Sequence, residues 1–210
     1  MRVFILALIA CAMISVSCQS AHTKATAWPV QWQSHFTEKI NFPVRGNMNV
    51  EGNWWYDFTN KMFRIDRTNG NYDRYCGTVY KFSNTPCSQI VREGVRHMYF
   101  PEKKFCCKCC TNAGGCGILT PTWIQAGVAS GREDVNGTEA YKYNVAGLQN
   151  NYYYETSANK PLRIFQEPLS DMIFTSNYSE STDPKVFDLP TDGGDCNQSC
   201  GLLTICHALA

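Results

Sequence analysis

Apolar and polar residues alternate with a period of two along much of the chain, which is the pattern of β-strands that bury one face. The clearest case is segment 47–58, where Met48, Val50, Trp54 and Tyr56 share one parity. Similar segments predict strands at 34–42, 47–58, 62–67, 72–82, 87–92, 95–99, 128–135, 139–145, 148–156, 162–168 and 172–178. The sequence therefore predicts an all-β sandwich or a strongly curved sheet.

Turn signals separate these segments. Asn69-Gly70 predicts a tight hairpin whose return strand is 72–82, and Asn136-Gly137 predicts a second hairpin. Helix signals are confined to two places. Thr120 and Pro121 can open a short helix, and 182–187 reads as a single helical turn.

The first residues read as a secretory signal peptide, because Arg2 precedes a short apolar run that ends in small residues. The run is too short to span a membrane. A lipoprotein cleavage box ending at Cys11 is the second interpretation. We therefore expect a signal peptide at 1–20, a tether at 21–33, one β domain at 34–195 and a cysteine-containing tail at 196–210.

Cysteines give the strongest chemical signal, because five of them lie between positions 106 and 116. Removal of the signal peptide leaves ten, and an even number in an oxidising compartment predicts disulfides. The expected disulfide cysteines are Cys76, Cys87, Cys106, Cys107, Cys109, Cys110, Cys116, Cys196, Cys200 and Cys206. Their connectivity is left open. The CxxC spacings also fit a zinc site, whereas a thioredoxin-like redox motif lacks its βαβ context.

The net charge bears on possible partners, and three sequons indicate possible glycosylation. The net charge is +1 without basic or acidic blocks, so nothing predicts binding to nucleic acid or to an anionic membrane surface. Three Asn-X-Ser/Thr sequons make Asn136, Asn177 and Asn197 candidate glycan sites.

Catalytic motifs are lacking, so we expect no enzyme. The four histidines do not form an HExxH pattern, and Ser130 is not in a GxSxG elbow. Asp192 and Asp195 could hold calcium, although such spacings are common in plain turns.

Several segments together resemble the ependymin-related family over about residues 35 to 196. They are Gly52-Asn53-Trp54-Trp55-Tyr56-Asp57, Arg64, the cysteine cluster, Gly131-Arg132-Glu133, 141–145, 152–155, Pro161, Asp183-Pro184, Phe187-Asp188-Leu189-Pro190 and Cys196. The resemblance implies a secreted protein with two curved antiparallel sheets around an apolar pocket, similar to bacterial lipoprotein carriers. It also implies binding of a lipid or another hydrophobic ligand, and the family is reported to bind calcium.

The inward parity of the early strands supplies candidate pocket residues, although the same side chains could simply fill a core. The candidates are Trp54, Tyr56, Phe63, Ile65, Tyr80, Phe82 and Tyr99, with Trp123 as a lid. We therefore expect a secreted, non-catalytic, monomeric or homodimeric carrier of a hydrophobic molecule. The alternatives are an extracellular structural or adhesive protein crosslinked through the cysteine cluster, and a metal site at that cluster.

Overall fold

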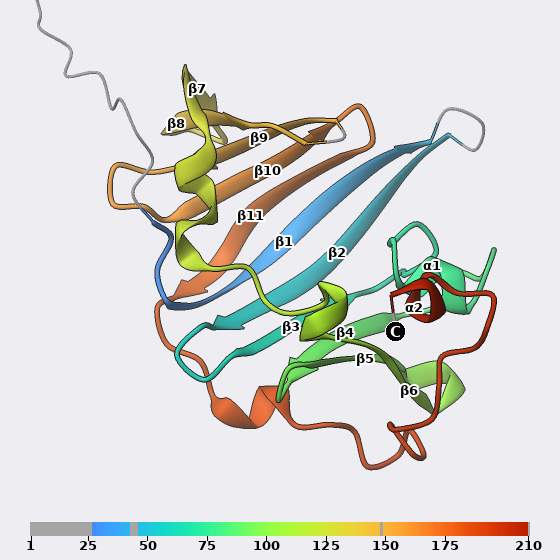
Figure 1. The fold of residues 1–210 in the computed structure, drawn as a ribbon. Helices are drawn as coiled ribbons and strands as arrows, with labels where there is room; N and C mark the ends of the chain where they lie inside the picture. Colours follow the sequence, from blue (N-terminus) through green and yellow to red (C-terminus); the bar gives the residue numbers. More distant parts are fainter. Residues whose placement is uncertain (1–26, 43–45, 148, 210) are drawn as a thin grey trace, which may run out of the picture.

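The computed structural model describes residues 27–42, 46–147 and 149–209 (Figure 1). Its strands form one antiparallel sheet in the order β6-β5-β4-β3-β2-β1-β11-β10-β9-β8-β7. The strands are β1 (Gln31–Phe42), β2 (Gly46–Asp57), β3 (Met62–Arg67), β4 (Cys87–Arg92), β5 (Val95–Phe100), β6 (Phe105–Thr111), β7 (Val128–Val135), β8 (Thr138–Val145), β9 (Asn150–Glu155), β10 (Pro161–Glu167) and β11 (Ser170–Ser179).

Helices are few and short in the described residues. They are α1 (Cys76–Val79), α2 (Ile205–Ala208) and the 3₁₀ helices η1 (Pro101–Lys103), η2 (Asn112–Gly114), η3 (Pro121–Ala126) and η4 (Pro184–Phe187). The short helix predicted after Thr120 is present as η3. Within the described part of the chain, no helix is long and apolar enough to cross a membrane.

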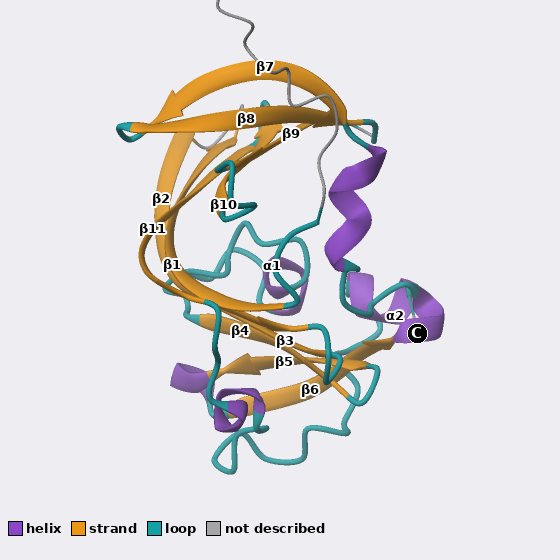
Figure 2. Ribbon diagram, turned by 90° about the vertical axis from the view of Figure 1, so that its left-hand side faces the viewer, coloured by secondary structure: helices purple, strands orange, loops and turns teal. Residues whose placement is uncertain are grey.

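The sheet is strongly curved, and Figure 2 shows it as an arch whose open side is crossed by η3. The predicted all-β, curved antiparallel class is confirmed. The strands form one continuous sheet instead of two, because β1 pairs with β11 along most of its length, for example Phe36 with Phe174 and Glu38 with Met172. This pairing joins the N-terminal strands to the C-terminal ones.

The main core fills the concave side of the arch. Trp28 and Trp32 are only 4% and 1% exposed and belong to this core. The predicted tether at 21–33 is therefore wrong from residue 27 onward, since β1 already begins at Gln31. Trp32 shares the parity of Phe36 and so extends the inward face of β1. The predicted signal peptide lies outside the described residues.

Gly52 in β2 shows how closely this core is packed. A Cβ atom there would lie 2.1 Å from the carbonyl oxygen of Asp66 and 2.3 Å from the ring of Phe36. Only glycine therefore allows the Phe36 ring to cover β2 at this point.

The return strand predicted at 72–82 is wrong. This segment contains α1 and turns, and β3 pairs instead with β4. Asp73 accounts for the difference, because its Oδ1 accepts the backbone N–H groups of Tyr75 and Cys76 at 2.9 Å each. Such acceptance stabilises the start of a helical turn in place of an extended strand.

All ten cysteines after residue 26 form disulfides within the chain. The pairs are Cys76–Cys87, Cys106–Cys196, Cys107–Cys200, Cys109–Cys206 and Cys110–Cys116. The zinc alternative is therefore contradicted, because these sulfurs are bonded to one another.

Three of these disulfides attach the C-terminal segment along edge strand β6. Backbone hydrogen bonds add to the attachment, with Cys106 N–H donating to Gly193 (2.7 Å) and Lys108 N–H to Gln198 (2.7 Å). The segment thus covers the backbone of an edge that would otherwise be open to strand addition.

Candidate functional site

Two adjoining cavities lie on the concave side of the sheet, with volumes of about 130 Å³ and 210 Å³. We call them the inner and the outer compartment. The side chains of Trp54, Phe63, Leu119 and Trp123 line both, and so form the wall between them. An engineered cavity of about 150 Å³ is enough to bind benzene, so each compartment can hold a small apolar group.

Aromatic rings make up most of the inner compartment. Trp54 lies 5.4 Å from Trp32 and 5.5 Å from Phe63, measured between ring centroids. On the other side Trp28 and Trp123 meet edge to face at 5.3 Å. Edge-to-face packing of this kind stabilises aromatic clusters beyond their burial alone. The inner compartment therefore has a firm, apolar wall.

Segment 117–126, which includes η3, covers both compartments. Ile118, Leu119, Pro121 and Trp123 contribute to the lining from this segment. Several polar contacts hold it: the Tyr56 hydroxyl donates to the Leu119 carbonyl at 2.7 Å, the Arg96 guanidinium donates to the Gly117 carbonyl at 3.3 Å, and the backbone N–H of Trp28 donates to Pro121 at 3.1 Å. The segment is thus held mainly through its first half and forms the cover of both compartments.

A row of charged and amide side chains forms the floor of the outer compartment and continues to the inner one. We call it the buried polar chain: Ser170, Glu38, Arg67, Asp73, Gln89 and Arg96. The Ser170 hydroxyl donates to Glu38 at 2.6 Å, and Arg67 lies 2.9 Å from Glu38 and 3.0 Å from Asp73.

The rest of the polar chain crosses strands β4 and β5. Gln89 donates to Asp73 at 2.7 Å and accepts from Arg96, whose guanidinium also donates to the carbonyl of Cys116 at 3.3 Å. The side chains of Arg67, Glu38 and Asp73 are 9%, 7% and 6% exposed. Burial acts to lower the pKa of Arg67, but Glu38 and Asp73 raise it above its usual value. The polar chain therefore places each arginine near acceptors within the chain, although Arg67 Nη1, 3.0 Å from Asp73, has no well-aligned acceptor among the described residues.

Glu155 is a separate buried carboxyl at the β8–β9 end of the concave side, with no exposed surface. Burial raises its pKa to about 7, opposed by the neighbouring Trp28 indole and Tyr143 hydroxyl. Its two oxygens have no well-aligned hydrogen-bond donor among the described residues. Burial is therefore the dominant effect on this group.

Five of the eight predicted pocket residues line the two compartments: Trp54, Tyr56, Phe63, Ile65 and Trp123. The other three lie elsewhere, which corrects the prediction. Tyr80 packs on Phe100, 4.7 Å between centroids, inside the disulfide cluster. Phe82 is 71% exposed in the turn that replaces the predicted strand. Tyr99 faces the convex side and donates to Asp192 at 2.7 Å.

Tyr99 was misplaced because both faces of β5 are covered, so apolar alternation does not identify the inward face. Its concave face carries Arg96, which the pattern treats as a solvent-facing charge. Sequence reasoning also missed Glu38, Arg67 and the two tryptophans Trp28 and Trp32. For the tryptophans a signal existed, since the parity of Phe36 extends back to Trp32.

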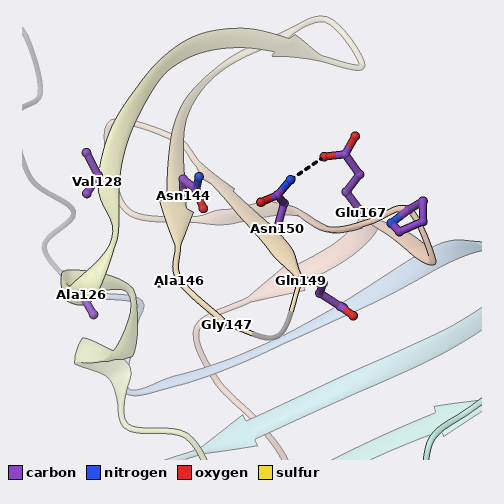
Figure 3. Close-up of a pocket in the computed structure, with 9 residues that line it drawn as sticks. Ala126, Val128, Asn144, Ala146, Gly147, Gln149, Asn150 and Glu167 are labelled. Carbon is purple, nitrogen blue, oxygen red and sulfur yellow. Dashed lines mark hydrogen bonds between the residues drawn. The ribbon is translucent and has the colours of Figure 1, made fainter.

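A hollow of about 780 Å³ lies at the rim of the arch near the β8–β9 turn. Figure 3 shows its lining, in which Asn150 donates to Glu167 at 3.2 Å. Ala126, Val128 and Ala146 are exposed there. An open rim of small and amide side chains has little to hold an apolar ligand, so the concave compartments are the stronger candidate.

Two further places are weaker candidates for a ligand site than the concave compartments. They are a polar groove on the convex side and the residues predicted to hold calcium. The groove contains His97, whose pKa is lowered by burial and by Lys108, and Arg92, which is paired with Asp188 at 2.6 Å. Asp192 accepts from Tyr99, and Asp195 accepts the backbone N–H of Asn197. The described residues contain no group of three or more His, Cys, Asp or Glu side chains that could hold a metal ion.

Comparison with known proteins identifies the fold only. No family model and no curated protein matches the sequence. Among solved structures, the chain is similar to an uncharacterized conserved protein from Thermus thermophilus, with a TM-score of 0.51 and 11% identity over 79% of this chain and 88% of that chain.

A LolA superfamily protein from Nitrosomonas europaea gives a TM-score of 0.40 and 9% identity over 77% of this chain and 91% of that chain. A DUF1329 family protein from Desulfovibrio piger gives a TM-score of 0.34 and 10% identity over 76% of this chain and 90% of that chain. The chain therefore shares its fold with the Thermus thermophilus protein, and the ependymin-related resemblance of its sequence stays a prediction.

Proposed function

We propose that this protein binds a lipid or another hydrophobic small molecule in the concave side of its sheet and catalyses no reaction. The observation that carries the proposal is the pair of adjoining compartments, lined by aromatic side chains and covered by segment 117–126. Movement of Leu119 and Trp123 would join the two compartments into one pocket. Burial of a ligand chain there would contribute about 0.8 kcal/mol per CH₂ group.

The proposed setting is the extracellular space or the lumen of the secretory pathway. Five disulfides are typical of proteins that mature in an oxidising compartment. The structural and adhesive alternative receives no support, because every cysteine of the cluster is already paired within the chain and no thiol of the described residues is left for crosslinks.

Native mass spectrometry of the secreted, deglycosylated protein tests the proposal. We expect a native mass that exceeds the denatured, non-reduced mass by a few hundred daltons, and a ligand in the denatured extract. Ile164→Trp should remove that excess, since Ile164 lines the outer compartment and a larger ring would fill it.

Ile173→Trp is the matched control, because Ile173 is also partly buried but belongs to a cluster on the convex face. It should retain the ligand. Equal native and denatured masses, with no binding of added lipid by the wild-type protein, would rule out the carrier function.

A further inference from the structure

The two compartments differ in chemistry, which bears on the kind of ligand they can hold. The inner compartment is lined by aromatic and aliphatic side chains and by one charged residue, Arg96. The outer compartment adds Glu38, Arg67, Gln89, Gln166 and Ser170 to its apolar lining. A ligand that occupies both therefore needs an apolar part and a polar part, which describes an amphiphile.

The polar part should be uncharged, because the charges around the outer compartment already neutralise one another. Arg67 lies between the carboxylates of Glu38 (2.9 Å) and Asp73 (3.0 Å), and Arg96 is linked to Asp73 through Gln89. Two cations thus accompany two carboxylates. An ionised headgroup would lose its hydration without meeting an unmatched countercharge, which is unfavourable in a buried site.

Hydrogen bonding remains available to an uncharged headgroup. Ser170 donates its only hydroxyl proton to Glu38, so its oxygen can still accept from a ligand hydroxyl. Gln166 donates to Asn151 at 3.2 Å from the same compartment. Hydroxyl groups would therefore find partners here, whereas a bare hydrocarbon would leave this polar floor without contacts.

The indole N–H of Trp54 supplies the most specific constraint on the chemistry of the ligand. It is buried and has no acceptor among residues 27–42, 46–147 and 149–209. An indole is a donor only, and a buried donor without an acceptor is unfavourable. The nitrogen itself is not exposed to either compartment, but Trp54 borders both, so a ligand oxygen that enters their junction as Leu119 and Trp123 move could accept this hydrogen bond. The Trp32 indole, 5.4 Å away between centroids, is likewise buried without an acceptor among these described residues.

We propose that the pocket selects an uncharged acyl amphiphile whose ester or amide carbonyl accepts a hydrogen bond from Trp54. The acyl chain extends through the inner compartment beneath segment 117–126, which moves to admit it, and a hydroxylated headgroup lies in the outer compartment. The inference rests on the proposed function and specifies its ligand class. A monoacylglycerol has this chemistry.

Binding of a matched set of probes to the delipidated, full-length secreted protein tests the inference. The probes are decanoylglycerol, its ether analogue decylglycerol, decanoate, decylammonium and decane, followed by tryptophan fluorescence. We expect decanoylglycerol to bind about tenfold more tightly than each of the others, which corresponds to about 1.4 kcal/mol. The ether keeps the headgroup and the chain but lacks the carbonyl, so it isolates the predicted hydrogen bond.

Trp54→Phe should abolish the preference for the ester over the ether, because phenylalanine keeps the ring but cannot donate. Trp55→Phe is the matched control. Trp55 lies next along β2 on the opposite face, near Arg64, and should leave the preference unchanged.

The outcomes separate this inference from the proposed function. If no probe binds, the carrier function itself fails. If decylglycerol, decane, decanoate or decylammonium binds as tightly as the ester, or if Trp54→Phe keeps the ester preference, the carrier function stands and the ligand class proposed here is wrong.

Discussion

At the scale of single residues, Glu155 makes the stability of the fold depend on pH. It has no exposed surface, and burial raises its pKa to about 7 from an ordinary value of 4.5. Below pH 4.5 the carboxyl is protonated in both the folded and the unfolded chain. Between pH 4.5 and 7 the unfolded chain releases this proton while the folded chain keeps it, so stability is lost progressively across this range. Above pH 7 the carboxyl is ionised in both states and adds no further slope.

We expect the free energy of unfolding to fall by about 3 kcal/mol between pH 4.5 and pH 8 from this group alone, at about 1.36 kcal/mol per pKa unit. Urea unfolding across this range measures the effect. Burial lowers the pKa of His97, which gives the opposite slope at acid pH. Glu155→Gln is therefore the control, since it keeps His97 and should remove only the loss between pH 4.5 and 7. The same pH profile in both proteins would contradict the prediction.

At the scale of elements, three neighbouring disulfides join β6 to the C-terminal segment, with sequence separations of 90, 93 and 97 residues. A disulfide stabilises chiefly by restricting the unfolded chain, and more so for longer loops. While any two of the three are present, the third closes only a short loop. The disulfide that remains last is therefore the one that closes the long loop.

Removal of Cys107–Cys200 alone by paired Cys→Ala changes should cost about 2 kcal/mol, whereas loss of the last remaining disulfide of the three should cost about 4–5 kcal/mol. Urea unfolding of the single, double and triple removals measures the order dependence. Cys76–Cys87, with a separation of 11, is the control for the loss of buried sulfur. Equal costs at each step would show that the loop argument does not apply.

The strands show why some elements were predictable and others were not. In β2, Trp54 and Tyr56 face the concave side as their parity predicts, because only one face of this strand carries the main core. The strand predicted at 72–82 is absent because Asp73 stabilises a turn and pairs with Arg67. The pairing with Arg67 depends on tertiary structure. The one local signal for this turn in the sequence was the carboxylate of Asp73, which precedes the short helix α1.

At the scale of the whole molecule, the sequence pattern identifies strands but not which distant strands pair. The single sheet depends on β1 and β11, which are far apart in sequence, and nothing in their local alternation specifies that pairing. The concave site was predictable from the sequence only in part. Its aromatic wall followed from parity, whereas Arg67 and Arg96 read as solvent-facing charges and are in fact buried with partners.

The outer surface carries the three sequons at separate places, away from both compartments. Asn136 lies in the β7–β8 turn, Asn177 in β11 and Asn197 in the C-terminal segment, and all three are exposed. A glycan requires an accessible asparagine, so the secreted protein is expected to carry three glycans when it passes through a glycosylating pathway.

Thr138→Ala, Ser179→Ala and Ser199→Ala should each remove one glycan, as measured by the intact mass before and after enzymatic deglycosylation. These changes spare the asparagines, which matters because Asn136 has a left-handed φ of 52° that favours asparagine over most residues. Ligand retention should be unchanged in all three variants, because the glycans lie outside the pocket. A variant that keeps the wild-type glycan mass would show that its sequon is not used, and loss of ligand from any variant would contradict the placement of the binding site on the concave side.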